Sequence, residues 1–70
     1  MLISYLRHRM VDKNIYDITE LMRLTDISRN TINKLYRNRQ VETVKIETII
    51  RLCKALECKM SDLVEYIPKG

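Results

Sequence analysis

A chain of 70 residues has room for one small domain, whose core leaves only about 3–5 kcal/mol of net stability. Its 13 Lys and Arg side chains against 9 Asp and Glu give a net charge of +4, and two cysteines are too few for a disulfide framework. No apolar run approaches the length needed to cross a membrane. These features exclude a disulfide-rich scaffold and a membrane-spanning protein.

The apolar residues at the N-terminus are too few for the apolar core of a signal peptide and are followed directly by Arg-His-Arg. We therefore expect no secretory leader. Cysteines used as small apolar residues suit a reducing compartment, so we expect a cytoplasmic protein.

Helices are the elements that the sequence predicts. The single Gly and the single Pro stand at positions 70 and 68, and the chain shows neither strand-like alternation nor a hairpin dipeptide. We therefore predict an all-α fold, a compact bundle of five short helices. The first helix is expected over residues 3–13, with Ile3, Leu6 and Met10 on its inward face.

The second helix is expected to begin after Asp17, an N-cap residue, with Glu20 completing a capping-box variant. It extends to about residue 24, and residues 25–28 form a turn. Asp26 is expected to be left-handed in this turn, a conformation that Asp tolerates better than most residues. Ile27 is expected to pack between the two helices, and Ser28 to cap the third.

The third helix, expected over residues 29–37 with Asn38 as its stop, has two distinct faces. On a wheel of about 100° per residue, its long polar side chains share an arc of about 140°: Arg29, Asn30, Asn33, Lys34 and Arg37. The opposite arc holds Thr31, Ile32, Leu35 and Tyr36. A free face of amide and guanidinium groups suits contact with base edges in a DNA major groove.

The fourth helix, expected over residues 46–57, has an inward stripe with two flanking apolar residues: Ile46, Ile49, Cys53 and Leu56, flanked by Ile50 and Leu52. Its start is weakly specified, because Lys45 is a poor N-cap and Thr43 is an alternative. A fifth short helix is expected to begin at residues 60–61, with Ser61 as its cap, and to end at Pro68.

The positive charge is concentrated in one segment. Residues 28–39 contain Arg29, Lys34, Arg37 and Arg39 and no acidic residue, whereas basic and acidic side chains balance over the rest of the chain. Such a segment fits either a solvated basic surface or a surface that binds nucleic acid. Charge alone does not choose between the two.

No combination of side chains indicates catalysis or metal binding. Cys53, Cys58 and the distant His8 match no zinc-ligand spacing, and two cysteines five apart in one predicted helix point in different directions and cannot form a disulfide. The sequence has no nucleophile beside a base, no glycine-rich phosphate loop and no facing carboxylate pair. We therefore expect no enzyme activity, no cofactor and no bound metal.

Two segments carry a resemblance to a known family: Thr-Asp-Ile-Ser-Arg-Asn-Thr-Ile at 25–32 and Leu-Cys-Lys-Ala-Leu at 52–56. Together they resemble the phage Cro and repressor type of helix-turn-helix, also called the xenobiotic-response-element family, especially its small single-domain bacterial regulators. The resemblance covers residues 16–68. It implies a lambda-repressor-like DNA-binding domain over residues 1–70, with the helix-turn-helix at about 17–37, acting as a homodimer on an inverted repeat in double-stranded DNA.

The resemblance also implies roles for individual residues. Positions that face bases in the family are occupied here by Arg29, Asn30, Asn33 and Lys34. Positions that cap the third helix or contact phosphate are occupied by Ser28, Arg37 and Arg39.

Three departures from the family pattern stand out. Ile18 replaces the glutamine that often binds phosphate at the second helix, so that contact is in doubt, and Met22 replaces a small residue, usually alanine. The glycines common at three turn or cap positions are Asp26, Asn38 and Glu57 here. A left-handed Glu57 should cost on the order of 1 kcal/mol.

The leading hypothesis is a sequence-specific DNA-binding regulator of transcription at the nucleoid. Repression by steric block is the simplest mode, because the sequence shows no second domain that could hold an effector. Dimer contacts are expected from the apolar residues of the 40–44 loop and the last helix, without an assignment. The sequence does not indicate whether a protein partner regulates this protein.

The alternative is a protein-interaction module on the same fold, such as an antitoxin-like or anti-regulator protein. A protein-binding surface should carry aromatic anchors and few charges. The free arc of the third helix has amide and basic side chains and no aromatic one, so we favour DNA.

Overall fold

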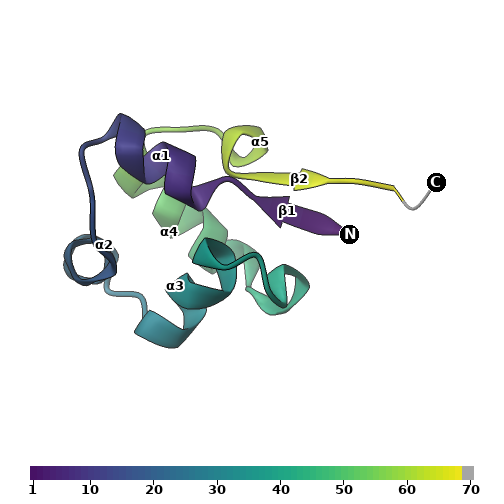
Figure 1. The fold of residues 1–70 in the computed structure, drawn as a ribbon, viewed down its shortest axis with the longest axis horizontal. Coiled ribbons are helices and arrows are strands. Elements are labelled where there is room, and N and C mark those ends of the chain that lie inside the picture. Colours follow the sequence, from purple (N-terminus) through teal and green to yellow (C-terminus); the bar gives the residue numbers. More distant parts are fainter. Residues whose placement is uncertain (69–70) are drawn as a thin grey trace.

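Five α-helices and two short strands make up residues 1–68, the part of the chain that this computed structural model describes (Figure 1). In chain order they are β1 (Leu2–Ser4), α1 (Leu6–Asp12), α2 (Ile18–Thr25), α3 (Arg29–Tyr36), the 3₁₀ turn η1 (Val41–Thr43), α4 (Ile46–Leu56), α5 (Met60–Leu63) and β2 (Val64–Tyr66). The predicted helical architecture is confirmed. Among the described residues, no helix is long and apolar enough to span a membrane.

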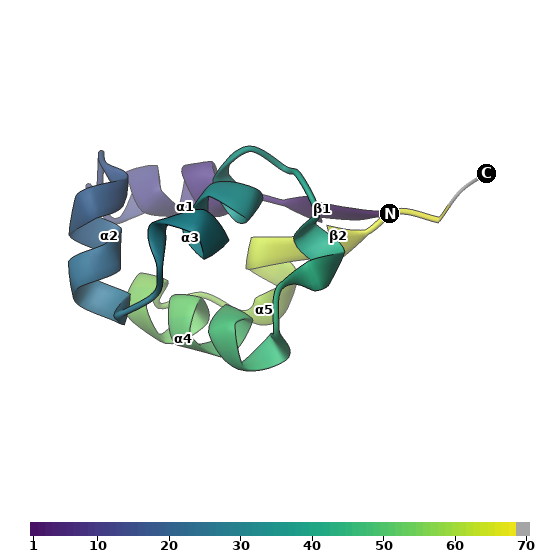
Figure 2. The ribbon, with the colours of Figure 1, turned by 90° about the horizontal axis from the view of Figure 1, so that it is seen from below.

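One hydrophobic core receives side chains from all five helices. Its buried members are Leu6, Met10, Ile15, Leu21, Ile27, Ile32, Leu35, Val41, Ile49, Leu52, Leu56 and Leu63. In Figure 2, α1 and α4 lie on opposite sides of the molecule, α2 lies at one end, and the two strands extend from the other end. Each helix is too short to be stable alone, so the shared core holds all of them in place.

The two strands correct the predicted ends of the first and last helices. α1 begins at Leu6 rather than residue 3, and α5 ends at Leu63, because the flanking residues pair as an antiparallel sheet. Ile3 lies opposite Glu65 in this pairing, and the Tyr5 N–H donates to the Leu63 carbonyl at 2.7 Å. Local helical periodicity cannot predict pairing between segments that lie about sixty residues apart.

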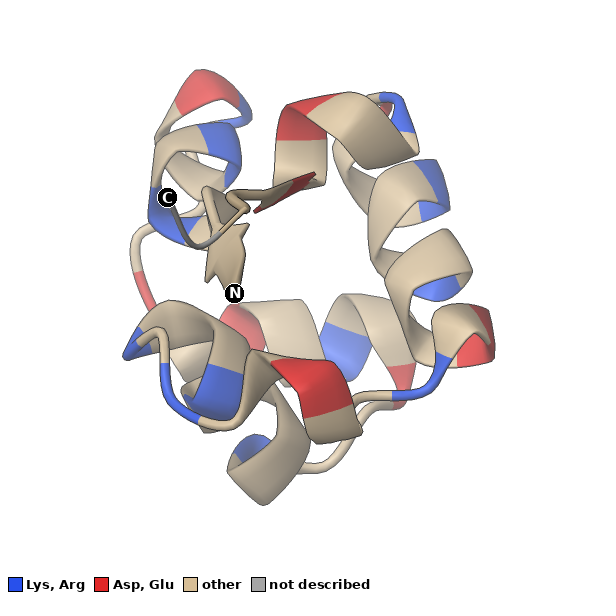
Figure 3. Ribbon diagram, turned by 90° about the vertical axis from the view of Figure 1, so that its right-hand side faces the viewer, with Lys and Arg blue, Asp and Glu red and all other residues tan. Residues whose placement is uncertain are grey.

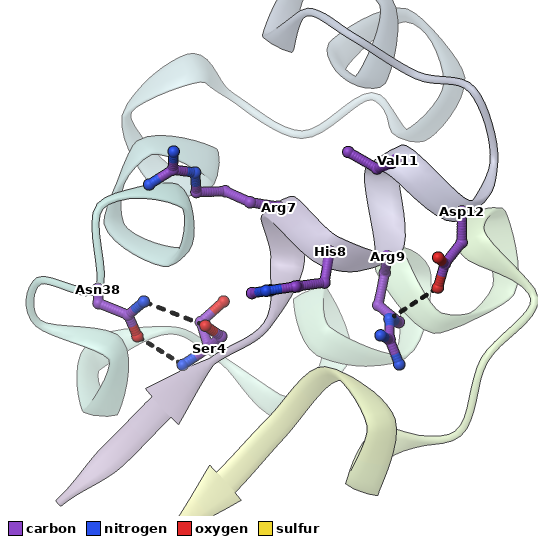
Figure 4. Close-up of a pocket in the computed structure, with 7 residues that line it drawn as sticks. All are labelled: Ser4, Arg7, His8, Arg9, Val11, Asp12 and Asn38. Atoms are coloured by element: carbon purple, nitrogen blue, oxygen red, sulfur yellow. Dashed lines mark hydrogen bonds and ion pairs between the residues drawn. The ribbon is translucent and has the colours of Figure 1, made fainter.

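Side chains from the segment after α3 complete the outer edge of β1. The Ser4 N–H donates to Asn38 Oδ1 at 2.5 Å, and Asn38 Nδ2 donates to the Ser4 carbonyl at 3.1 Å (Figure 4). The Leu2 N–H donates to Glu42 Oε2 at 3.2 Å. Hydrogen bonds from the backbone N–H groups of Glu42 itself and of Leu2 lower the pKa of the Glu42 carboxyl. The N-terminal strand is thereby tied to the segment that follows α3.

The predicted caps of the helix-turn-helix are confirmed. The Asp17 side chain accepts from the Glu20 N–H at 2.7 Å, and the Ser28 hydroxyl accepts from the Thr31 N–H at 3.3 Å. The Glu20 carboxylate is directed to Arg23 instead of back to Asp17, at 2.6 Å, so the reciprocal half of the capping box is replaced by an ion pair. In the turn, Asp26 is left-handed with φ of 57° and Ile27 is buried, as predicted.

The inward face of α4 differs from the prediction. Ile49, Leu52 and Leu56 are buried, whereas Ile46 is 63% exposed and Ile50 is 42% exposed. The sequence contains two overlapping stripes at helical spacing, and the position of α4 against α2 and α5 selects the second. The helix begins after Lys45, which has no side-chain cap, and Thr43 belongs to η1.

The residues after α4 also differ in detail. α5 is capped at Lys59, not at Ser61, and the Lys59 N–H donates to Asp62 Oδ2 at 3.1 Å. Cys58 lies beyond the end of α4, where its N–H donates to the Cys53 carbonyl at 3.1 Å, so the prediction that both cysteines share one helix is wrong. Both are free thiols. Burial, and to a smaller extent the neighbouring Cys58, raises the pKa of the Cys53 thiol to about 11.

Left-handed residues occupy the three positions at which the family resemblance implies glycine. Asp26, Asn38 and Glu57 have φ values of 57°, 55° and 52°, and Asn14 and Gln40 share this conformation. Asp and Asn visit it readily, whereas a glutamate is strained there. The Glu57 side chain is exposed and pairs with Lys13 at 3.1 Å, a surface contact of small value.

We predict that Glu57→Gly is more stable than Glu57→Ala by about 1 kcal/mol, because only glycine is free of the left-handed penalty. Both variants lose the ion pair with Lys13, so their difference isolates the backbone effect. Urea unfolding of the two variants measures it. Equal midpoints, or a less stable glycine variant, would contradict the strain assigned to Glu57.

Candidate nucleic-acid interface

The apolar side of α3 faces the core and its polar side faces away from it. Ile32 and Leu35 have no exposed surface, and Thr31 and Tyr36 are half-buried. On the opposite side, Arg29, Asn30 and Arg37 are exposed, and Asn33 and Lys34 are half-buried. The five predicted polar residues therefore share one accessible surface, which we call the α3 polar face.

Outside the segment 28–39, four of the eight basic residues that the structure describes are paired with acids. Lys and Arg occur on several helices, with Asp and Glu among them (Figure 3). Ion pairs join Arg9 to Asp12, Lys13 to Glu57, Arg23 to Glu20 and Arg51 to Glu47. Within residues 1–68, none of the ion pairs involves Arg29, Lys34, Arg37 or Arg39. Arg7, Lys45, Lys54 and Lys59 also lie outside these pairs, but basic and acidic side chains are equal in number outside the segment 28–39. The net positive charge therefore lies on α3 and the segment after it.

Two of these basic side chains are held by neutral hydroxyl groups. Arg29 Nη2 donates to Thr19 Oγ1 on α2 at 3.0 Å, and Lys34 Nζ donates to Thr43 Oγ1 on η1 at 3.0 Å. A hydroxyl orients a cation without cancelling its charge. Both groups therefore stay available to an anionic partner while their positions are restricted.

The segment after α3 places two arginines beside the polar face. Arg37 is the C-cap residue, and the Arg39 N–H donates to the Lys34 carbonyl at 2.9 Å, which closes the end of the helix. Asn38 between them is left-handed, as predicted, and is hydrogen-bonded to β1. Both arginine side chains are exposed on this anchored backbone.

The structure also shows what the two unusual residues of α2 do. Ile18 and Met22 are half-buried and pack against the core. Ile18 therefore offers no polar group at the position where the family resemblance implies a phosphate-binding glutamine. The next residue, Thr19, is exposed and is hydrogen-bonded to Arg29.

Three contacts that shape this surface could not be predicted from the sequence. Thr19 showed no pattern that linked it to Arg29, and Asn38 gave no sign of its pairing with Ser4. The Arg7 guanidinium lies over the Tyr36 ring at 5.1 Å and connects α1 to the end of α3. Each contact joins residues ten or more positions apart, so no local spacing could have predicted it.

The apolar residues suggested by the sequence for dimer contacts differ in exposure. Val41 and Leu63 are 3% and 0% exposed and belong to the core. Met60 on α5 and Tyr66 on β2, which lie in the last predicted helix, are 39% and 66% exposed. The dimer contact itself stays a prediction.

A surface pocket of about 540 Å³ lies beside α1, bordered by Ser4, Arg7, His8 and Asn38 among others (Figure 4). Among residues 1–68, no group of three or more His, Cys, Asp or Glu side chains is arranged to hold a metal ion.

Comparisons with known proteins agree with this geometry. Residues 5–69 match the family described as Cro/C1-type HTH DNA-binding domain. The chain is similar to the "Uncharacterized HTH-type transcriptional regulator YozG" of Bacillus subtilis (strain 168), with 32% identity over 57 residues, covering 81% of this chain and 67% of the relative. No solved structure matches significantly. The chain therefore belongs to the Cro/C1-type helix-turn-helix family of DNA-binding domains.

Proposed function

We propose that this protein is a sequence-specific transcriptional repressor that places α3 in the major groove of double-stranded DNA. One observation carries the proposal: the α3 polar face is accessible, rich in amide and cationic donors, and makes no ion pair within the described residues. Phosphates supply the missing negative charge, and base edges supply acceptors that match these donors. A docking site for an apolar protein surface would instead need aromatic anchors.

The base-contacting roles follow from donor geometry. A guanidinium such as that of Arg29 forks onto the O6 and N7 atoms of guanine, and the amide of Asn30 or Asn33 pairs with adenine. Each such contact contributes roughly 1–3 kcal/mol of discrimination between bases. Lys34 adds a further donor at the half-buried edge of the face.

Phosphate contacts are assigned to the ends of α3. Ser28 caps the helix at the end where backbone N–H groups are free, which favours an anion there. Arg37 and Arg39 extend from the anchored segment at the other end. Contacts at both ends would fix the register of the helix in the groove, and binding would weaken as salt rises.

We further propose that the protein acts as a homodimer on an inverted repeat. The eight residues of α3 reach only a few base pairs, and two copies with half-sites about 34–36 Å apart would combine their affinities. Repression would follow from steric block of a promoter at the nucleoid.

Selection of bound duplexes from a random pool, followed by a salt titration on the winning sequence, tests the proposal. We expect an inverted-repeat consensus and an affinity that falls steeply with salt. A pool that shows no enrichment, together with no duplex binding at low ionic strength, would refute DNA recognition and favour the protein-interaction alternative. Enrichment of a single half-site would refute the dimer.

We predict that Arg29→Ala removes the preference for one base at one position of each half-site, because its forked contact supplies that discrimination. The expected loss is roughly 1–3 kcal/mol on the preferred sequence, with little change on sequences substituted at that position. Binding to the selected duplex and its three single-base variants measures it. An unchanged preference would show that Arg29 does not contact a base.

We predict that Arg39→Ala weakens binding to all duplexes alike and lowers the log–log salt slope by about one unit, because a phosphate contact carries no sequence information. Binding isotherms at several salt concentrations, on selected and scrambled duplexes, give both quantities. Arg51→Ala is the matched control, since this exposed arginine lies on α4 and pairs with Glu47. A loss confined to the selected sequence would assign Arg39 to base recognition instead.

A further inference from the structure

A hydrogen bond links the first turn of α2 to the first residue of α3. Thr19 Oγ1 accepts from Arg29 Nη2 at 3.0 Å, across ten residues of sequence that include the turn of the motif. Both residues are exposed. Figures 1 and 2 both show α2 beside the start of α3, which brings the two side chains within reach.

The other residues of this turn cannot do what Thr19 does. Ile18 packs against the core. Glu20 would form an ion pair with a free arginine, but both of its carboxylate oxygens are occupied by Arg23, at 2.6 and 3.1 Å. Arg29 is thus left with a neutral partner, and its full positive charge remains available.

The bond uses a small part of the donor capacity of Arg29. A guanidinium has five N–H groups, and one bond to Thr19 leaves enough of them for a forked contact with guanine. An unrestrained arginine loses much conformational freedom when it binds, which weakens binding. A partner on the rigid backbone of α2 restricts the side chain before DNA arrives.

We propose that Thr19 is the positioning residue for Arg29, and that α2 thereby determines the base preference at the position that Arg29 contacts. This inference rests on the proposed function of α3. It assigns a role in recognition to a residue that itself contacts no base, and it gives the exposed hydroxyl of Thr19 a purpose that neither capping nor core packing supplies.

The test compares Thr19→Val, which keeps the shape and removes the hydroxyl, with Thr19→Ser, which keeps the hydroxyl. We expect Thr19→Val to weaken binding to the selected duplex about two- to tenfold, with the loss restricted to duplexes carrying the base that Arg29 prefers. Thr19→Ser should bind like the parent. The salt slope and the unfolding midpoint should be unchanged in both variants.

A double-mutant cycle separates positioning from a merely structural role. In the Arg29→Ala background, Thr19→Val should have no further effect, because the side chain that it positions is absent. An equal loss on all four base variants, or the same loss in both backgrounds, would overturn the proposal and leave DNA recognition by α3 intact. Full affinity and preference in Thr19→Val would also overturn it. A parent chain that binds no duplex would refute both proposals together.

Discussion

The burial of two side chains, Ile32 and Leu35, is the interaction on which the candidate interface depends. A helix of eight residues is not stable alone in water, and burying side chains of this kind contributes roughly 1.5–3 kcal/mol each. Both are fully buried, and this fixes the rotation of α3 about its axis as well as its existence. Because Ile32 and Leu35 face the core, the polar face on the opposite side of α3 faces solvent.

The same core determines how charge is distributed on the surface. On other helices, some basic side chains pair with an acid one helical turn away, as in Arg23 with Glu20 and Arg51 with Glu47. On α3 the neighbours are hydroxyl groups from adjacent elements, Thr19 and Thr43. Neutral partners orient the cations without lowering the positive potential, and this suits a surface that attracts and positions a polyanion.

Much of the candidate site was predictable because it depends on local chemistry. The caps at Asp17 and Ser28 and the left-handed turn residue Asp26 involve neighbours within a few positions, and the structure has all of them as predicted. The residues that stabilise the site were not predictable. Thr19, and the Asn38 amide that holds β1, act on partners ten and thirty-four positions away.

Short-range properties made the helices, the caps of α2 and α3 and the two-faced character of α3 readable from the sequence alone, because periodicity and capping involve residues a few positions apart. The strand pairing became visible only in three dimensions: residues 3–4 and 64–66 leave their predicted helices, and residues 2–4 pair with 64–66. The tertiary structure also decided which of two overlapping stripes α4 buries, leaving Ile46 in solvent. In both cases the stabilising partner is distant in sequence, so the residue pattern within one segment cannot predict the contact.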